Sequence, residues 1–187
     1  MIIANGFDSD AIKILTAKKN LRLINGSNYK SEKLLKFMSF DQNIMIQSED
    51  LNLFSKKNFK IVSKRKPTTK QLKDLIFAFN VCRYVKSNAI VLASNETTVG
   101  IGSGQPSRLD SCQIAINKMK KFNLQNNNLV AASDAFFPFV DGIEKLVQSG
   151  VKAVVQPSGS IRDKEIIKFA NETGTVLLFS KTRHFRH

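Results

Sequence analysis

The segment at residues 100–108 reads GIGSGQPSR, and it joins an alternating apolar run to a helical pattern that begins near Ser107. Three glycines at alternate positions allow the backbone to turn tightly and to come close to a neighbour. Ser107 followed by Asp110 resembles a capping box, so we expect a helix to begin there. The N-terminus of a helix suits an anion, and Arg108 adds a charged fork beside it. The alternative is a strand-to-helix turn without a ligand, because the segment matches neither the Walker pattern nor GxGxxG.

Upstream of this segment the pattern predicts one long helix and a hairpin. A capping box at Thr68 and Gln71 opens a helix whose apolar residues recur as far as Cys82. Residues 89–93 predict a buried strand, and residues 97–101 return as its antiparallel partner. Before Thr68 the signals are weaker, with a helix capped by Asp8 or Ser9. Strands are expected there at residues 2–4, 21–24, 44–46 and 59–62, and a turn of helix at residues 34–38.

Downstream of the segment, strands and helices alternate regularly after a polar loop at residues 123–128. The expected strands cover residues 129–132, 151–155 and 175–179, and the expected helices cover residues 142–148 and 163–173. Such alternation with short loops implies parallel strands joined by right-handed crossovers. Ligands of open sheets of this kind bind beyond the carboxyl ends of the strands.

Three unusual segments follow those strand ends, at residues 133–139, 156–162 and 182–187. The first carries Phe136, Phe137 and Phe139, which either plug the core or form the wall of a pocket for a flat ring. The second is a turn of small residues before a helix N-terminus, and is therefore a second candidate site for an anion or carbonyl group. The third is a basic tail, in which Phe185 indicates packing against the rest of the protein.

Composition limits the classes of function. The 187 residues are 42% hydrophobic and 24% charged, as expected for a globular domain with a sizeable core. The sequence has neither a run of apolar residues long enough for a bilayer nor the pattern of a signal peptide. Cys82 and Cys112 lie far apart and are interpreted as buried thiols in a reducing compartment. Neither HxE nor HExxH is present, which argues against metal-assisted hydrolysis.

The formal net charge of +14 raises the question of nucleic acid binding. A basic patch could hold phosphates without sequence preference, but no RNP-like, zinc-finger or helix-turn-helix signature accompanies the basic residues. A solvated surface, or one that attracts an anionic small substrate, is the favoured interpretation. The basic clusters are Lys56, Lys57, Lys60, Lys64, Arg65 and Lys66, then Lys118, Lys120 and Lys121.

Five segments occur in the order in which they are found in the AICAR transformylase family. These are residues 86–90, 100–108, 133–139, 157–160 and 183–187. The chain resembles the formyltransferase part of a bifunctional purine biosynthesis protein whose separate N-terminal domain is IMP cyclohydrolase. The resemblance is close from about Lys64 onward and looser over residues 2–24 and 44–50. Asn5 stands where the family usually has proline, and residues 42–43 stand where it commonly has a glycine pair.

The resemblance implies a cytidine-deaminase-like α/β fold, with three layers and a mixed sheet, that the family's domain contains twice. Residues 1–187 would be the C-terminal portion of that domain, with residues 67–187 well matched and residues 1–66 less certain. No cyclohydrolase domain would be present. The implied reaction transfers a formyl group from the cosubstrate 10-formyltetrahydrofolate to aminoimidazole carboxamide ribonucleotide. A cytoplasmic homodimer is expected for the complete enzyme, without a catalytic metal, a membrane or nucleic acid as partner.

The resemblance also implies binding roles by position. The nucleotide would contact Asn88, Arg108, Phe136 and Arg183, and the folate would contact Leu109, Asp141, Gly142, Ser160 and Ile161. The family's catalytic lysine–histidine pair would precede Met1, so we expect no catalytic residue in this chain. The chain's imidazoles, His184 and His187, belong to a tail that the family does not use as a base. We therefore expect the isolated chain to be inactive.

Two other functions compete with the formyltransferase hypothesis. One is a non-enzymatic basic module that binds nucleic acid or another polyanion, for which salt-dependent binding of random oligonucleotides would be the signature. The other is a zinc deaminase, suggested by the fold. That hypothesis fails because the sequence has no His/Cys/Cys set at a usable spacing.

Overall fold

The computed structural model describes residues 1–28, 35–122 and 128–186. The chain divides into two compact units, Met1–Glu49 (unit 1) and Asp50–His187 (unit 2). The polar loop predicted at residues 123–128 lies outside the described residues except for Asn128. No helix in the described ranges has the length and apolar character needed to cross a membrane.

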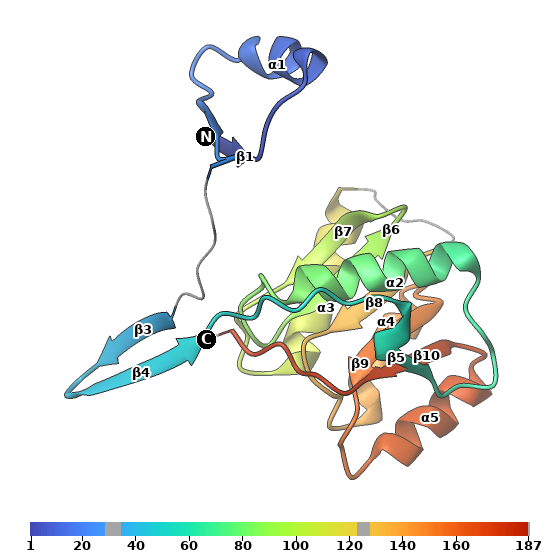
Figure 1. The fold of residues 1–187 in the computed structure, drawn as a ribbon. Coiled ribbons are helices and arrows are strands. Elements are labelled where there is room, and N and C mark those ends of the chain that lie inside the picture. Colours follow the sequence, from blue (N-terminus) through green and yellow to red (C-terminus); the bar gives the residue numbers. More distant parts are fainter. Residues whose placement is uncertain (29–34, 123–127, 187) are drawn as a thin grey trace. The chain divides into compact units, whose positions relative to one another are not determined.

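Unit 2 is built on a mixed sheet that has six strands among the described residues, in the order β5-β10-β9-β8-β6-β7 (Figure 1). The strands β8, β9 and β10 are parallel, whereas β6 runs antiparallel to both β7 and β8, and β5 runs antiparallel to β10. The predicted hairpin and the predicted parallel strands are therefore confirmed. Their bounds are β5 (Phe59–Ile61), β6 (Ile90–Ser94), β7 (Thr97–Gly102), β8 (Val130–Ser133), β9 (Ala153–Pro157) and β10 (Val176–Ser180).

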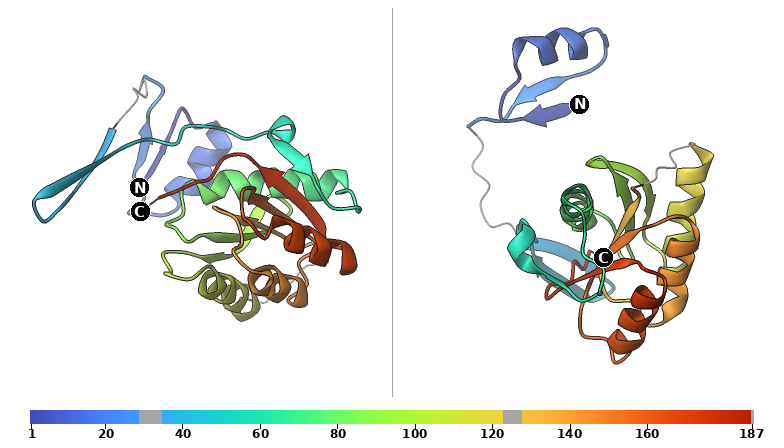
Figure 2. Two further views of the ribbon diagram at one scale, coloured as in Figure 1. Left: turned by 90° about the horizontal axis from the view of Figure 1, so that it is seen from below. Right: turned by 90° about the vertical axis from the view of Figure 1, so that its right-hand side faces the viewer.

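Helices cover both faces of this sheet (Figure 2). The helix α2 (Thr69–Cys82) lies on one face, and α3 (Arg108–Lys121), α4 (Val140–Gln148) and α5 (Asp163–Glu172) lie on the other. The Thr68–Gln71 capping box is formed, and a short 3-10 helix, η1 (Lys56–Asn58), precedes β5. The result is the predicted three-layer α/β fold with a mixed sheet.

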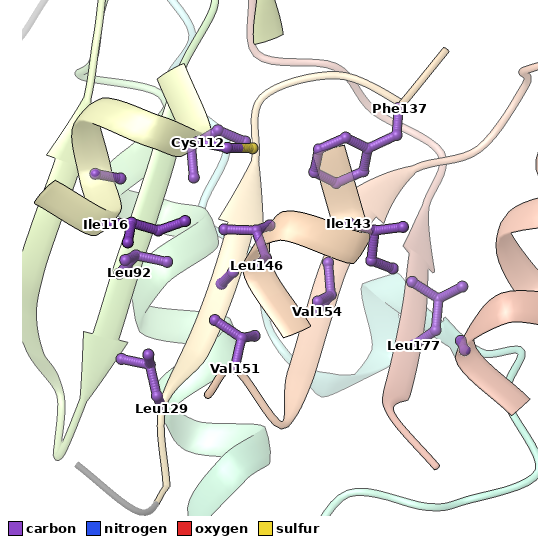
Figure 3. Packing of buried hydrophobic residues seen from close by; sticks show 14 of the residues in the cluster. Leu92, Cys112, Ile116, Leu129, Phe137, Ile143, Leu146, Val151, Val154 and Leu177 are labelled. Atoms are coloured by element: carbon purple, nitrogen blue, oxygen red, sulfur yellow. The ribbon is translucent and has the colours of Figure 1, made fainter. Parts of the chain in front are cut away.

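Two apolar cores hold the three layers together. On the α2 side, Leu75, Phe79 and Cys82 pack on the sheet and are fully buried. On the other side, Cys112, Ile143 and Leu146 pack with Phe137 and with strand residues (Figure 3). Burial of each large apolar side chain stabilises the fold by about 1.5–3 kcal/mol. Strand residues alternate between the two cores, as in Val154 and Val155, which fixes the register of the sheet.

The glycines of the segment at residues 100–108 serve the packing of α3. Gly100 and Gly102 lie inside β7, and a Cβ atom on Gly102 would stand 1.9 Å from the backbone oxygen of Ser111. Gly104, with φ of +67°, makes the turn itself. The helix begins after Ser107 as predicted, but the predicted capping box is wrong, because the Ser107 side chain makes no capping hydrogen bond. Aspartate at the third helical position is shorter than the Glu or Gln that normally reaches back.

Unit 1 contains two small pieces of sheet among its described residues. The strands β1 (Ile2–Ala4) and β2 (Leu23–Asn25) are parallel, and α1 (Ser9–Thr16) between them begins at the predicted cap, Asp8. The strands β3 (Leu35–Phe40) and β4 (Asn43–Ser48) form an antiparallel hairpin. The turn of helix expected at residues 34–38 is wrong over its described part. Residues 35–40 instead extend to pair with β4 across a turn in which Asp41 has φ of +52°.

Candidate functional site

Arg108, the first residue of α3, is the centre of a buried polar cluster. Its Nε donates to Ser133 Oγ over 3.0 Å, and its Nη1 donates to the backbone oxygen of Phe136 over 3.1 Å. Its Nη2 donates to Asn88 Oδ1 over 2.9 Å and to Asp134 Oδ1 over 2.8 Å. Because a guanidinium has five N–H groups, these contacts leave it one for a ligand.

The two charged side chains of this cluster are largely or fully buried. The side chain of Arg108 is 11% exposed, and that of Asp134 is fully buried. A buried ion pair keeps its geometry because separating the two charges would leave one of them without compensation. The second carboxylate oxygen of Asp134 is buried and has no hydrogen-bond partner among the described residues. The cluster therefore ties the N-terminus of α3 firmly to the end of β8.

Asn88 fixes the loop that leads into α3. Its side-chain amide donates to the backbone oxygens of Gln105 and Pro106 over 2.9 and 3.1 Å. Its own backbone oxygen accepts from Ser111 Oγ over 2.7 Å, and a cis peptide bond joins it to Ser87. The predicted nucleotide residues Asn88 and Arg108 are thus in direct contact, and each is also part of the protein's internal hydrogen bonding.

A groove of about 330 Å³ opens beside this cluster. Five residues predicted to bind ligands lie along it: Asn88 and Arg108 from the nucleotide set, and Leu109, Asp141 and Gly142 from the folate set. They come from the starts of α3 and α4 and from the end of the segment before β6, which meet beyond the strand ends. The other lining residues are Pro106, Ser107, Phe137, Pro138 and Phe139.

The three phenylalanines after β8 have different environments. Phe137 is buried in the core and lies 2.7 Å from the position that a Cβ atom of Gly142 would take. Phe139 is 52% exposed at the groove. Phe136 is half-buried, and the guanidinium of Arg183 stands over its ring, 4.6 Å from the centroid. Of the two interpretations of this segment, core plug or pocket wall, Phe137 fits the first. Phe136 and Phe139 lie at the surface, where the second needs them.

The turn between β9 and α5 lies close to the same region. A Cβ atom on Gly159 would be 3.5 Å from Arg183 Nη2, and Arg162 stacks over the Phe139 ring at 4.8 Å. The predicted folate residues Ser160 and Ile161 belong to this turn, but neither is among the residues that line the groove. Ile161 is fully exposed, so its side chain is available to a ligand or to another surface.

The cysteines are unsuited to act as nucleophiles. Both are free, buried thiols. Burial raises the pKa of the Cys112 thiol to about 12, and burial followed by the charge of Asp134 raises the pKa of Cys82 well above its ordinary value. The described residues also contain no group of three or more His, Cys, Asp or Glu side chains that could hold a metal ion.

Sequence reasoning did not assign roles to Ser133 and Asp134, although they form half of the polar cluster. The signal was a Ser-Asp pair directly after a buried strand, where side chains converge on the end of the sheet. The tail packs against the rest of unit 2, as Phe185 indicated, but its buried residue is the neighbouring His184, whereas Phe185 is 44% exposed. The partner of His184, Asp50, is 134 residues away, so no local pattern could have revealed the contact.

Comparisons with known proteins agree on one family. A family model described as "AICARFT/IMPCHase bienzyme" matches residues 1–118. Three curated proteins, each named bifunctional purine biosynthesis protein PurH, align with the whole chain. They come from Persephonella marina (44% identical), Buchnera aphidicola subsp. Schizaphis graminum (47%) and Aquifex aeolicus (43%). The chain spans 36% of the length of each of these relatives.

Proposed function

Because the chain belongs to the AICARFT/IMPCHase bienzyme family, we propose that it serves the transfer of a formyl group from 10-formyltetrahydrofolate to aminoimidazole carboxamide ribonucleotide. The observation that carries this proposal is the convergence of the candidate residues. Asn88 and Arg108, proposed for the nucleotide, line one groove at the N-termini of α3 and α4 together with Leu109, Asp141 and Gly142, proposed for the folate. A transferase needs its two substrates held side by side in this way.

In this proposal each side of the groove has its own ligand. Arg183 and Phe136, which stack on each other and are not among the residues that line the groove, hold the nucleotide by charge and by stacking on its flat ring. The remaining N–H of Arg108 is directed to the polar groups of the nucleotide. Leu109, Gly142 and the exposed Ile161 offer apolar contact to the folate, and Asp141 offers it a hydrogen-bond acceptor. The groove thus combines an apolar wall with a few fixed polar groups, as small-molecule sites usually do.

Among the described residues, which do not include His187, we assign binding groups and no general base. The substrate amine is a weak nucleophile, so its attack needs a group that removes a proton and a donor for the oxyanion. His184 is 1% exposed and its Nδ1 is paired with Asp50, which makes it unavailable to a substrate in the groove. We propose that the base belongs to a part of the enzyme outside this chain, and that the chain alone does not turn over.

The same proposal includes the domain, the oligomeric state and the cellular compartment of the complete enzyme. Residues 1–187 form the C-terminal part of a duplicated transformylase domain. The complete enzyme is a homodimer, and the exposed apolar residues of the β3–β4 hairpin, such as Phe37, Ile44 and Ile46, support a need for a covering surface. Two buried free thiols support a reducing compartment, the cytoplasm.

Reconstitution tests the proposal. The purified chain is assayed for formyl transfer alone, and then after mixing with the part of the Buchnera aphidicola PurH that this chain does not match. We expect no turnover at first and measurable turnover after mixing. Substantial turnover by the chain alone, abolished by His184→Ala, would show that the base lies in this chain.

The second candidate function is the binding of a polyanion, because the chain has a net charge of +14. Tighter binding of random oligonucleotides than of the ribonucleotide would favour it.

A further inference from the structure

The tail that follows β10 contains one deeply buried residue. His184 is 1% exposed, whereas Arg183 before it is exposed and Phe185 after it is 44% exposed. Successive side chains of an extended segment point to opposite sides. A histidine that is fixed inward therefore turns Arg183 outward, to the place where its guanidinium stacks on Phe136.

His184 is held from two directions. Its Nδ1 contacts the carboxylate of Asp50, the first residue of unit 2. Its ring packs against Phe54, with centroids 5.0 Å apart, and against Phe79, with centroids 4.5 Å apart. Its Nε2 is buried and has no hydrogen-bond partner among the described residues. If the Asp50 contact were lost, both ring nitrogens would be buried without a partner, which is costly.

The backbone around His184 is joined to the candidate site. His184 N donates to the backbone oxygen of Asp134 over 2.9 Å, next to the Arg108 cluster. Ser87 N donates to the backbone oxygen of Arg186 over 2.9 Å, and Arg186 N donates to Ser87 Oγ over 3.1 Å. These bonds fix the tail to the two segments that carry Asp134 and Asn88, so release of His184 would loosen the tail where it meets them.

We propose that Asp50 and His184 form a positioning pair that holds Arg183 in its ligand-binding orientation over Phe136. Asp50 fixes the imidazole, the imidazole fixes the tail, and the tail presents Arg183. Neither member of the pair touches the ligand. The part of this inference that concerns binding rests on the proposed function, whereas the part that concerns the order of the tail does not.

A role in simple core filling would give different results. The filler role needs only a ring between Phe54 and Phe79, so His184→Phe would satisfy it. The positioning role needs the contact with Asp50, so Asp50→Ala and His184→Phe should both release the tail. Glu172→Ala is a matched control, because it removes a carboxylate from an exposed surface pair with Lys168 in the same unit.

Hydrogen exchange without any ligand tests the order of the tail. We expect Asp50→Ala and His184→Phe to speed exchange in the tail at residues 182–186 by about tenfold or more, with α2 and β8 unchanged, because local opening is set by the lost contacts. Glu172→Ala should leave that exchange unchanged. Unchanged exchange in both Asp50→Ala and His184→Phe would overturn the proposal.

Titration with the ribonucleotide, below the melting temperature of every variant, tests the effect on Arg183. Asp50→Ala should weaken binding by about tenfold, roughly 1.4 kcal/mol. In an Arg183→Ala background the same change should weaken binding by less than about twofold, because the arginine it positions is gone. Additive losses would overturn the positioning role. Absence of binding by the unmodified chain would count against the proposed function, and the exchange experiment would still decide the order of the tail.

Discussion

Two arginines border the candidate site, and their environments differ sharply. Arg108 is 11% exposed and gives its hydrogen bonds to Asn88, Ser133, Asp134 and the backbone of Phe136. Arg183 is exposed, and its guanidinium stacks on the ring of Phe136. The comparison shows that position beside a ligand groove does not by itself make an arginine a ligand-binding residue. An arginine that gives four of its five N–H groups to the protein mainly holds the fold together, and a solvent-facing one is available to an anion.

The largest expected effect is on the buried arginine. Arg108→Ala should lower the free energy of unfolding by about 3–5 kcal/mol, because it leaves the fully buried Asp134 carboxylate without its partner. Urea unfolding followed by circular dichroism measures this loss. Arg183→Ala, which removes the same side chain from an exposed position, should change the midpoint little. Equal unfolding midpoints for the two variants would contradict the conclusion that Arg108 stabilises the fold and Arg183 does not.

Phe137 and Phe136 differ in burial as the two arginines do. Phe137→Ala should cost about 3–5 kcal/mol of stability, because it removes a fully buried ring. Phe136→Ala removes a half-buried ring and should lower nucleotide binding while barely changing the melting temperature. A thermal melt read beside a binding titration separates the two roles. A large drop in melting temperature for Phe136→Ala, with normal binding by the folded protein, would make Phe136 a core residue.

The smallest expected effect concerns Cys112, which lies beneath the groove. Burial raises its pKa from 9.0 to about 12, so the unfolded chain releases the thiol proton at a lower pH than the folded protein does. Stability contributed by the neutral thiol is therefore complete below pH 9.0 and is lost as the pH rises toward 12. Between pH 9 and pH 10 the loss should be at most about 1.4 kcal/mol. Urea unfolding of the unmodified chain and of Cys112→Ala at both values measures it, and identical pH dependence would contradict the assignment.

Much of unit 2 was predictable from local patterns. The α2 helix follows its capping box, and the hairpin of β6 and β7 follows from apolar alternation around Asn95 and Glu96, both of which have positive φ. The parallel strands follow from their alternation with helices. In unit 1, the turn of helix expected at residues 34–38 is wrong over residues 35–38, because Leu35, Phe37 and Met38 fit a helical spacing as readily as a strand. The pairing with β4 decides between the two.

The candidate site was only half predictable. The groove gathers Asn88, Arg108 and Asp141 because helix N-termini meet beyond the sheet, which the strand–helix order indicates. The hydrogen bonds that Arg108 makes within the protein were not predictable, since its partners Ser133 and Asp134 lie 25 and 26 residues away in the sequence. Contacts between residues so far apart in the sequence depend on how the strands pair, and no local sequence pattern indicates that pairing.

One titration tests the central claim, that Arg183 binds the nucleotide and Arg108 supports the fold. Calorimetry with the ribonucleotide is performed on the unmodified chain, on Arg183→Ala and on Arg83→Ala, a control whose arginine stacks on Tyr84 at 4.5 Å instead of on Phe136. We expect Arg183→Ala to weaken binding by about 1.5–3 kcal/mol, the usual loss for a charged hydrogen bond, with an unchanged unfolding midpoint. Arg83→Ala should bind normally. Binding by Arg183→Ala as tight as that of the unmodified chain would contradict the account.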